Sequence, residues 1–212
     1  MTDHKSVSLA DRVFEKLETD ILSGRYVYGE ILTEARLSEE LNVSRTPVRE
    51  AIRRLEQENI LQETGRGMMV LGITRDDIAD ILDVRLCVEG MAARRAAENI
   101  SDEMLAALAE AVELQEFYAA RGNYEHIQSQ DHCFHEIIYA ACGSTTLQNT
   151  LLPLHRKAQK YRRASVERAG RALASVAEHR AIYEALAAHD ADAAEEAVLT
   201  HIRHARESML GE

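Results

Sequence analysis

The sequence has little of what defines several protein classes. Its 212 residues include three cysteines, two prolines and no tryptophan. Cys87, Cys133 and Cys142 form no Cys-x-x-Cys pair, so we expect small buried thiols in a reducing compartment rather than a disulfide framework. No apolar run approaches the roughly 18 residues that a membrane-spanning helix needs, and no apolar leader opens the chain. These absences predict a cytoplasmic protein with no membrane partner.

Positive charge is also scarce, because 25 basic residues stand against 36 acidic ones and give a formal net charge of −11. Such an excess argues against binding nucleic acid by bulk attraction. The charge is unevenly spread, however: residues 1–74 carry −3 and residues 75–212 carry −8. Between Arg36 and Arg54 the balance reverses, with five arginines and three glutamates. A local positive stripe is therefore compatible with an acidic chain.

Apolar residues recur every three or four positions in the first part of the chain, which predicts helices at about 9–22, 37–41 and 48–55. Only Asn42, Val43 and Ser44 separate the last two, so these helices must meet at a sharp angle. Ser44 is expected to cap the third helix, and Pro47 falls in its first turn, where a missing N–H costs nothing.

The period then changes to that of short strands, at residues 60–62 and 68–71, joined by Gly65-Arg66-Gly67. Three helices and a hairpin predict a winged helix-turn-helix over residues 1–74. From residue 75 to 212 the patterns are helical and rich in alanine. They predict a mainly α protein whose second domain is an antiparallel bundle of six helices, at about 75–98, 102–121, 123–142, 145–168, 171–188 and 191–210.

Arginines occupy the positions from which a recognition helix reads DNA. Arg45 and Arg49 lie one turn apart on one face, and a guanidinium can bond both O6 and N7 of guanine. Arg36 opens the preceding helix, and Arg66 lies between two glycines at the tip of the hairpin. For two arginines alone, an ordinary solvated helix face would be the simpler interpretation.

The segment from Leu37 to Glu56, followed by Gly65-Arg66-Gly67, resembles the DNA-binding domain of GntR-type transcriptional regulators. The resemblance covers residues 9–72 and implies a homodimer that binds an inverted-repeat operator, with repression the expected direction. It also implies the DNA-contacting residues, some on bases or phosphates and some at the wing: Arg36, Arg45, Thr46, Arg49, Arg66 and Gly67.

Asp131 and His135 lie four residues apart on one predicted helix and so project from the same face. His179 and His201 fall on later helices. Three imidazoles and a carboxylate suit zinc or nickel. From the residues alone, a helix-surface pair or a capped histidine is the more common interpretation of such a spacing.

The pattern Asp131-His132-Cys133-Phe134-His135 is similar to that of the all-helical FCD effector domain in the FadR branch of GntR regulators, in its shorter VanR-like version. This resemblance implies that Asp131, His135, His179 and His201 bind a divalent metal, zinc or nickel. It further implies that Arg85 clamps the carboxylate of a small organic acid effector. The alternative for Arg85 is a salt bridge to Glu89, four residues on.

The remaining histidines of this region match no motif, so we expect them to be exposed or to cap helices: His126, His132, His155, His189 and His204. Tyr139 is expected to line a pocket or merely to pack. No His-Glu-x-x-His or Glu-x-x-His motif occurs, so we expect no enzyme. The alternatives are a metal-dependent enzyme on a helical bundle and a regulator whose metal is only structural.

Overall fold

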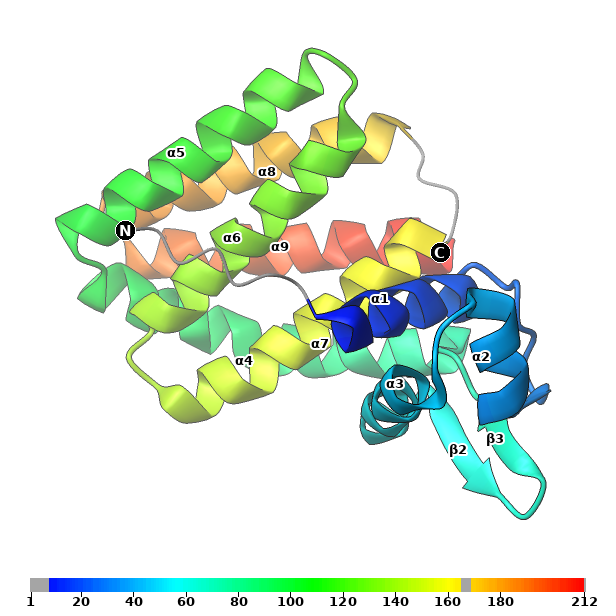
Figure 1. Ribbon diagram of the computed structural model, residues 1–212. Coiled ribbons are helices and arrows are strands. Elements are labelled where there is room, and N and C mark those ends of the chain that lie inside the picture. The colour runs from blue at the N-terminus through cyan, green and yellow to red at the C-terminus, as the bar shows by residue number, and fades with distance from the viewer. Residues whose placement is uncertain (1–7, 165–168, 212) are drawn as a thin grey trace. The chain divides into compact units, whose positions relative to one another are not determined.

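The computed structural model describes residues 8–164 and 169–211, and most of these residues are helical (Figure 1). The chain divides into two compact units, and the boundary along the sequence lies between Thr74 and Arg75. The mainly α fold class, with a winged helix-turn-helix before an all-helical unit, is confirmed. None of the helices in the described residues is long and apolar enough to cross a membrane.

From residue 8 onward, the first unit contains three helices and three short strands: α1 Leu9–Leu22, β1 Ile31–Leu32, α2 Glu34–Leu41, α3 Arg45–Gln57, β2 Leu61–Thr64 and β3 Gly67–Val70. The strands form an antiparallel sheet in the order β1-β3-β2. Strand β1 was not predicted, because two residues are too few to show a period of two. It pairs Ile31 with Met69 and Leu32 with Met68.

The turn between α2 and α3 follows the prediction in its main features. Asn42 ends α2 in the left-handed conformation, with φ 51°, which a short polar side chain tolerates. Pro47 lies in the first turn of α3, as expected. Ser44 occupies the N-cap position, but its side chain makes no capping hydrogen bond with the described residues, which corrects that detail.

The core of the first unit fixes which face of α3 points outward. The fully buried residues Leu17 from α1, Leu37 from α2 and Leu55 from α3 belong to one hydrophobic core. Leu61 of β2 is buried in the same core. Burying each such side chain stabilises the fold by roughly 1.5–3 kcal/mol. The opposite face of α3 is therefore left to solvent.

The second unit consists, in its described residues, of six helices, which confirms the predicted bundle: α4 Arg75–Asn99, α5 Asp102–Ala119, α6 Tyr124–Ala141, α7 Thr145–Ala164, α8 Ala169–Ala187 and α9 Ala191–Leu210. The predicted end of the fourth helix of this unit, residue 168, lies outside the described residues. Figure 1 shows α9 between α4 and α8, and it contacts both.

Small residues let α4 and α9 approach closely. The buried face of α4 includes Ala92, Ala93, Ala96 and Ala97, and a Cβ added at Gly90 would lie 3.1 Å from the Glu195 side chain of α9. The other half of α4 buries Arg85 and Glu89 instead. Helix α4 thus buries small alanine side chains along one half of its length and charged side chains along the other.

The hairpin provides a test of this fold. Gly67 has φ 137°, and a Cβ there would lie 2.7 Å from the Leu32 carbonyl oxygen, so Gly67→Ala must push β3 away from β1. We expect a loss of about 1–3 kcal/mol in the free energy of unfolding of the first unit. Urea unfolding followed by the amide NMR signals of residues 67–70 measures it.

Gly65→Ala is the matched control, because a Cβ at Gly65 meets nothing within 4 Å. Its unfolding free energy should stay within about 1 kcal/mol of the starting protein. Equal stabilities for the two variants would contradict the close β1–β3 approach.

Candidate metal centre and nucleic-acid interface

The outer face of α3 carries the predicted DNA-contacting side chains. Arg45, Thr46 and Arg49 are exposed, whereas Val48 and Ile52 on the same helix are buried. This division follows from helical periodicity, since the apolar residues recur every three or four positions. Helix α3 can therefore present a polar face to DNA without disturbing the core.

Carboxylates hold two of these arginines. Arg49 donates two hydrogen bonds to Glu34, from Nε and Nη2 and both 2.8 Å long, and Arg36 donates to Glu30 and Glu40, each at 2.7 Å. The bond from Arg49 lowers the pKa of Glu34. Because these groups are largely exposed, the pairs orient the guanidinium groups more than they stabilise the fold.

The hairpin tip carries the other two predicted residues. The Arg66 side chain is exposed, and its backbone N–H donates to the Thr64 hydroxyl at 3.3 Å. That hydroxyl donates to the Gly67 carbonyl at 2.6 Å and so closes the turn. All six predicted DNA-contacting residues thus lie in α2, α3 and the hairpin, and their contact with DNA stays a prediction.

In the helical unit, three helices bring the four predicted metal ligands together. Asp131 and His135 project from α6, His179 from α8 and His201 from α9, and all four residues are at most 3% exposed. Ligand nitrogens of the three histidines lie within 4.8 Å of one another. Asp131 Oδ1 lies 3.6 Å from His179 Nε2. The surface-pair alternative is therefore wrong for these residues.

Each of the three histidines turns its Nδ1 toward an acceptor outside the cluster. His179 Nδ1 lies 2.6 Å from Gln115 Oε1, and His201 Nδ1 lies 2.8 Å from Glu178 Oε2. His135 Nδ1 faces Glu89 Oε1 at 3.5 Å. An acceptor beside Nδ1 places the ring proton there and leaves the Nε2 lone pair for a metal.

The charges of the surrounding groups favour metal ligation. Burial lowers the pKa of His201 to about 4, so this imidazole is neutral at pH 7, as a ligand must be. Although burial opposes it, hydrogen bonds from His201 and Arg171 lower the pKa of Glu178 to about 2. A charged Glu178 thus holds the proton on the outer nitrogen of His201.

The donor set fits a divalent metal. Within the described residues, the buried His135 Nε2 has no hydrogen-bond partner. Buried polar atoms are rarely left in this state, and a bound ion is one of the recognised explanations. Three imidazole nitrogens and a carboxylate oxygen are the ligands that zinc and nickel accept.

Arg85 forms the buried salt bridge with Glu89 that was its alternative assignment. Its Nε and Nη2 donate to the Glu89 carboxylate at 2.7 and 3.1 Å, and Tyr139 donates to Glu89 Oε1 at 2.8 Å. Although burial opposes ionisation, Arg85 holds the pKa of Glu89 well below its usual range. Glu89 therefore joins Arg85 to His135, and Tyr139 contributes a polar contact rather than only packing.

His155 corrects the expectation of an exposed or capping histidine. It is 3% exposed, and its Nε2 lies 3.3 Å from Asp131 Oδ2. Burial lowers its pKa to about 3. The sequence held a signal, because Leu151, His155 and Ala158 are spaced as one buried helix face.

The remaining expectation for the unmatched histidines holds in part. His126, His189 and His204 are exposed, and His189 Nδ1 lies 2.7 Å from the Ala97 carbonyl. His132 is half-buried.

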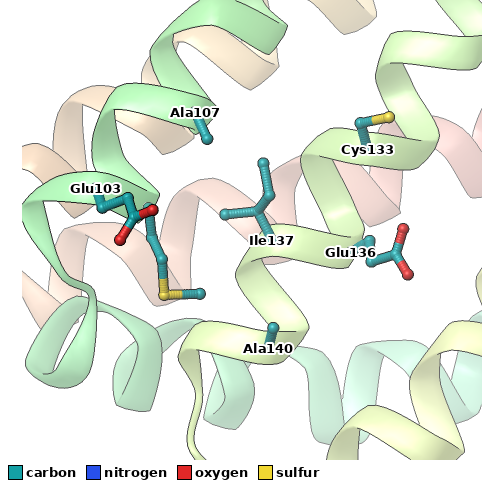
Figure 2. A pocket seen from close by; sticks show the side chains of 7 residues that line it. Glu103, Ala107, Cys133, Glu136, Ile137 and Ala140 are labelled. Atoms are coloured by element: carbon teal, nitrogen blue, oxygen red, sulfur yellow. The ribbon is translucent and has the colours of Figure 1, made fainter. Parts of the chain in front are cut away.

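A groove of about 480 Å³ lies on the other face of α6, between α5 and α6 (Figure 2). It is lined by residues that do not belong to the histidine cluster: Glu103, Met104, Ala107, Cys133, Glu136, Ile137 and Ala140. Cys133 is exposed there, and Cys87 is exposed as well, which corrects the expectation of buried thiols; Cys142 is buried.

Comparison with known proteins gives two domain matches and several relatives. Residues 9–70 match the family described as bacterial regulatory proteins, gntR family, and residues 80–204 match the FCD domain. A gluconate operon transcriptional repressor of Bacillus licheniformis is 35% identical over 127 residues, which are 60% of this chain and 52% of that protein. The chain thus spans about half the length of that relative.

Two solved structures share the fold. Escherichia coli McbR/YncC aligns with a TM-score of 0.70 and 24% identity, over 93% of this chain and 95% of that one. A GntR regulator described as putative, from Rhodococcus sp. RHA1, aligns with a TM-score of 0.68 and 25% identity, over 95% and 97%. With a gntR-type first unit and an FCD domain that covers more than half of its residues, the chain belongs to the GntR family of bacterial regulatory proteins, in its FCD-containing FadR branch.

Proposed function

We propose that the protein is a sequence-specific DNA-binding transcriptional regulator, acting as a repressor, whose helical unit binds a divalent metal and a small carboxylate effector. One observation carries the proposal: the buried side chains of Asp131, His135, His179 and His201 converge in a chain that also has a winged helix-turn-helix. The names of relatives support the DNA-binding part, since one is a repressor of the gluconate operon.

DNA binding requires a homodimer and an inverted-repeat operator in this proposal. Each copy would place α3 in one major groove and its hairpin near the adjacent backbone. The acidic helical unit would be kept off the DNA by its own field, so affinity must come from the few arginines of α2, α3 and the hairpin, doubled by symmetry. Binding should therefore weaken steeply with salt.

The metal would be held by His135, His179, His201 and Asp131, and when bound it supplies a Lewis-acidic centre for an effector's oxygens. Arg85 would contribute the second contact. Arg85 donates hydrogen bonds from Nε and Nη2 to Glu89, so its third nitrogen, Nη1, would be the one that binds an effector carboxylate. An acid changes operator affinity only if it binds the DNA-competent and DNA-incompetent states with different affinities.

A structural metal is the second candidate, because the four ligands are almost completely buried, as in closed structural sites. In that case a chelator would unfold the helical unit, and organic acids would leave operator affinity unchanged.

The DNA contact is tested with Arg49→Ala. On a duplex selected from a random library by the starting protein, we expect discrimination against unrelated DNA to fall by about 1–3 kcal/mol, because a bidentate guanine contact is lost. Fluorescence anisotropy measures both affinities. Arg203→Ala is the matched control, since Arg203 is equally exposed and also pairs with a glutamate, but lies on α9. Retained discrimination in Arg49→Ala would refute the assignment.

The metal is tested by elemental analysis of purified protein and by zinc titration of the metal-free protein. We expect one ion per chain, and His179→Ala should bind zinc at least about ten-fold more weakly. His126→Ala, which removes an exposed histidine, should bind normally. An unchanged metal content in His179→Ala would sink the ligand assignment.

The effector is tested at a fixed, saturating zinc concentration by adding hydroxy acids, sugar acids and dicarboxylates to the protein–operator complex. Arg85→Lys keeps a charge beside Glu89 but loses the planar fork. We expect this variant to bind zinc normally while its operator complex responds to the acid only at about ten-fold or higher concentration. An equal acid response would remove Arg85 from the effector site, and turnover of an acid would favour the enzyme alternative.

A further inference from the structure

His155 lies in the interior without the hydrogen bonds that a buried imidazole normally makes. It projects from α7, the helix that contributes none of the four predicted ligands, and its side chain is 4% exposed. Neither of its ring nitrogens has a hydrogen-bond partner within the described residues. Leaving such a group unsatisfied costs roughly 1–3 kcal/mol, so its burial needs a reason.

The position of His155 relative to Asp131 and His135 supplies one. Ligand atoms of these three residues lie within 4.8 Å of one another, and they form a second group that shares two members with the predicted set. The ring centroids of His155 and His135 are 4.2 Å apart, and the angle between the ring planes is 36°. This arrangement places a fourth imidazole beside Asp131 and His135, which are two of the four predicted ligands.

The Asp131 carboxylate lies between the two sides of the cluster. Its Oδ1 is 3.6 Å from His179 Nε2, and its Oδ2 is 3.3 Å from His155 Nε2. Gln159, one turn after His155 on α7, also donates to Oδ2. The two oxygens of this carboxylate therefore lie near imidazoles of two different helices, α8 and α7, and the His155 ring nitrogen lies close to the carboxylate that the proposed metal would share.

We propose that His155 is a fifth protein ligand, so that α6, α7, α8 and α9 all bind the same ion. This inference rests on the metal centre of the proposed function. It has a consequence for the effector: five protein ligands leave one position in a six-coordinate sphere. A carboxylate effector would then bind the ion through a single oxygen, and Arg85 would hold the other.

The test counts the ligating imidazoles directly. The full-length protein, labelled with ¹⁵N-histidine, is loaded with ¹¹³Cd²⁺, and each nitrogen bound to cadmium shows a one-bond coupling to the metal. We expect four coupled ring nitrogens and one cadmium per chain. His155→Leu should retain three couplings and bind cadmium at least about ten-fold more weakly.

His126→Leu is the matched control, because it removes an exposed histidine and should retain all four couplings. Circular dichroism verifies that both variants are folded, and the count in the unsubstituted protein does not depend on either of them. The result therefore holds even if His155→Leu fails to fold.

The possible outcomes distinguish a failure of the His155 assignment from a failure of the metal centre itself. Three coupled nitrogens in the unsubstituted protein would leave the metal centre in place and overturn the role of His155, as would four couplings that persist in His155→Leu. Two cadmium ions per chain would also overturn it, because the single shared sphere would be wrong. Absence of any coupling would refute the metal centre itself.

Discussion

Satisfying buried polar groups is the constraint on which the helical unit depends. Its interior contains a guanidinium, carboxylates and four imidazoles where a bundle normally places leucines. Each charge there needs a partner, since an unpaired ion is costly in a low dielectric. Arg85 and Glu89 satisfy each other, and Gln115 and Glu178 satisfy the outer nitrogens of His179 and His201. The inner nitrogens of the three histidines lie close together, where the proposed ion would bind.

This constraint distributes the site over the whole bundle. Helix α4 contributes Glu89 beside His135, α5 contributes Gln115, and α8 contributes both His179 and the Glu178 that holds His201. Any change that moves one helix must change the ligand geometry, because interiors are close-packed and transmit displacement. Through the same connection, an ion bound at the proposed centre would bias the arrangement of the helices, which is what a regulatory effector requires.

How much the sequence predicts depends on the range of the interaction. The helices follow from local periodicity, and a spacing of four places Asp131 and His135 on one helix face. Their role as metal ligands was implied only by the resemblance to the FCD domain. Gln115 could not be predicted, because it meets His179 from 64 residues away and no local pattern records that contact. His155 lies on a buried face that the spacing of Leu151 and Ala158 predicts, but imidazoles are common on surfaces, so the prediction of an exposed or capping histidine is wrong.

The ion pairs that hold the arginines of α2 and α3 in the first unit are exposed to solvent, unlike the pair buried inside the helical unit. Glu34 and Glu40 hold Arg49 and Arg36, so DNA would have to exchange a carboxylate for a phosphate or a base edge at each arginine. Exposed pairs contribute about 0–1 kcal/mol, so this exchange is inexpensive and leaves the guanidinium groups already ordered. The net charge of −11 is therefore no obstacle to DNA binding. It favours binding that depends on a few oriented arginines over binding that depends on the total field.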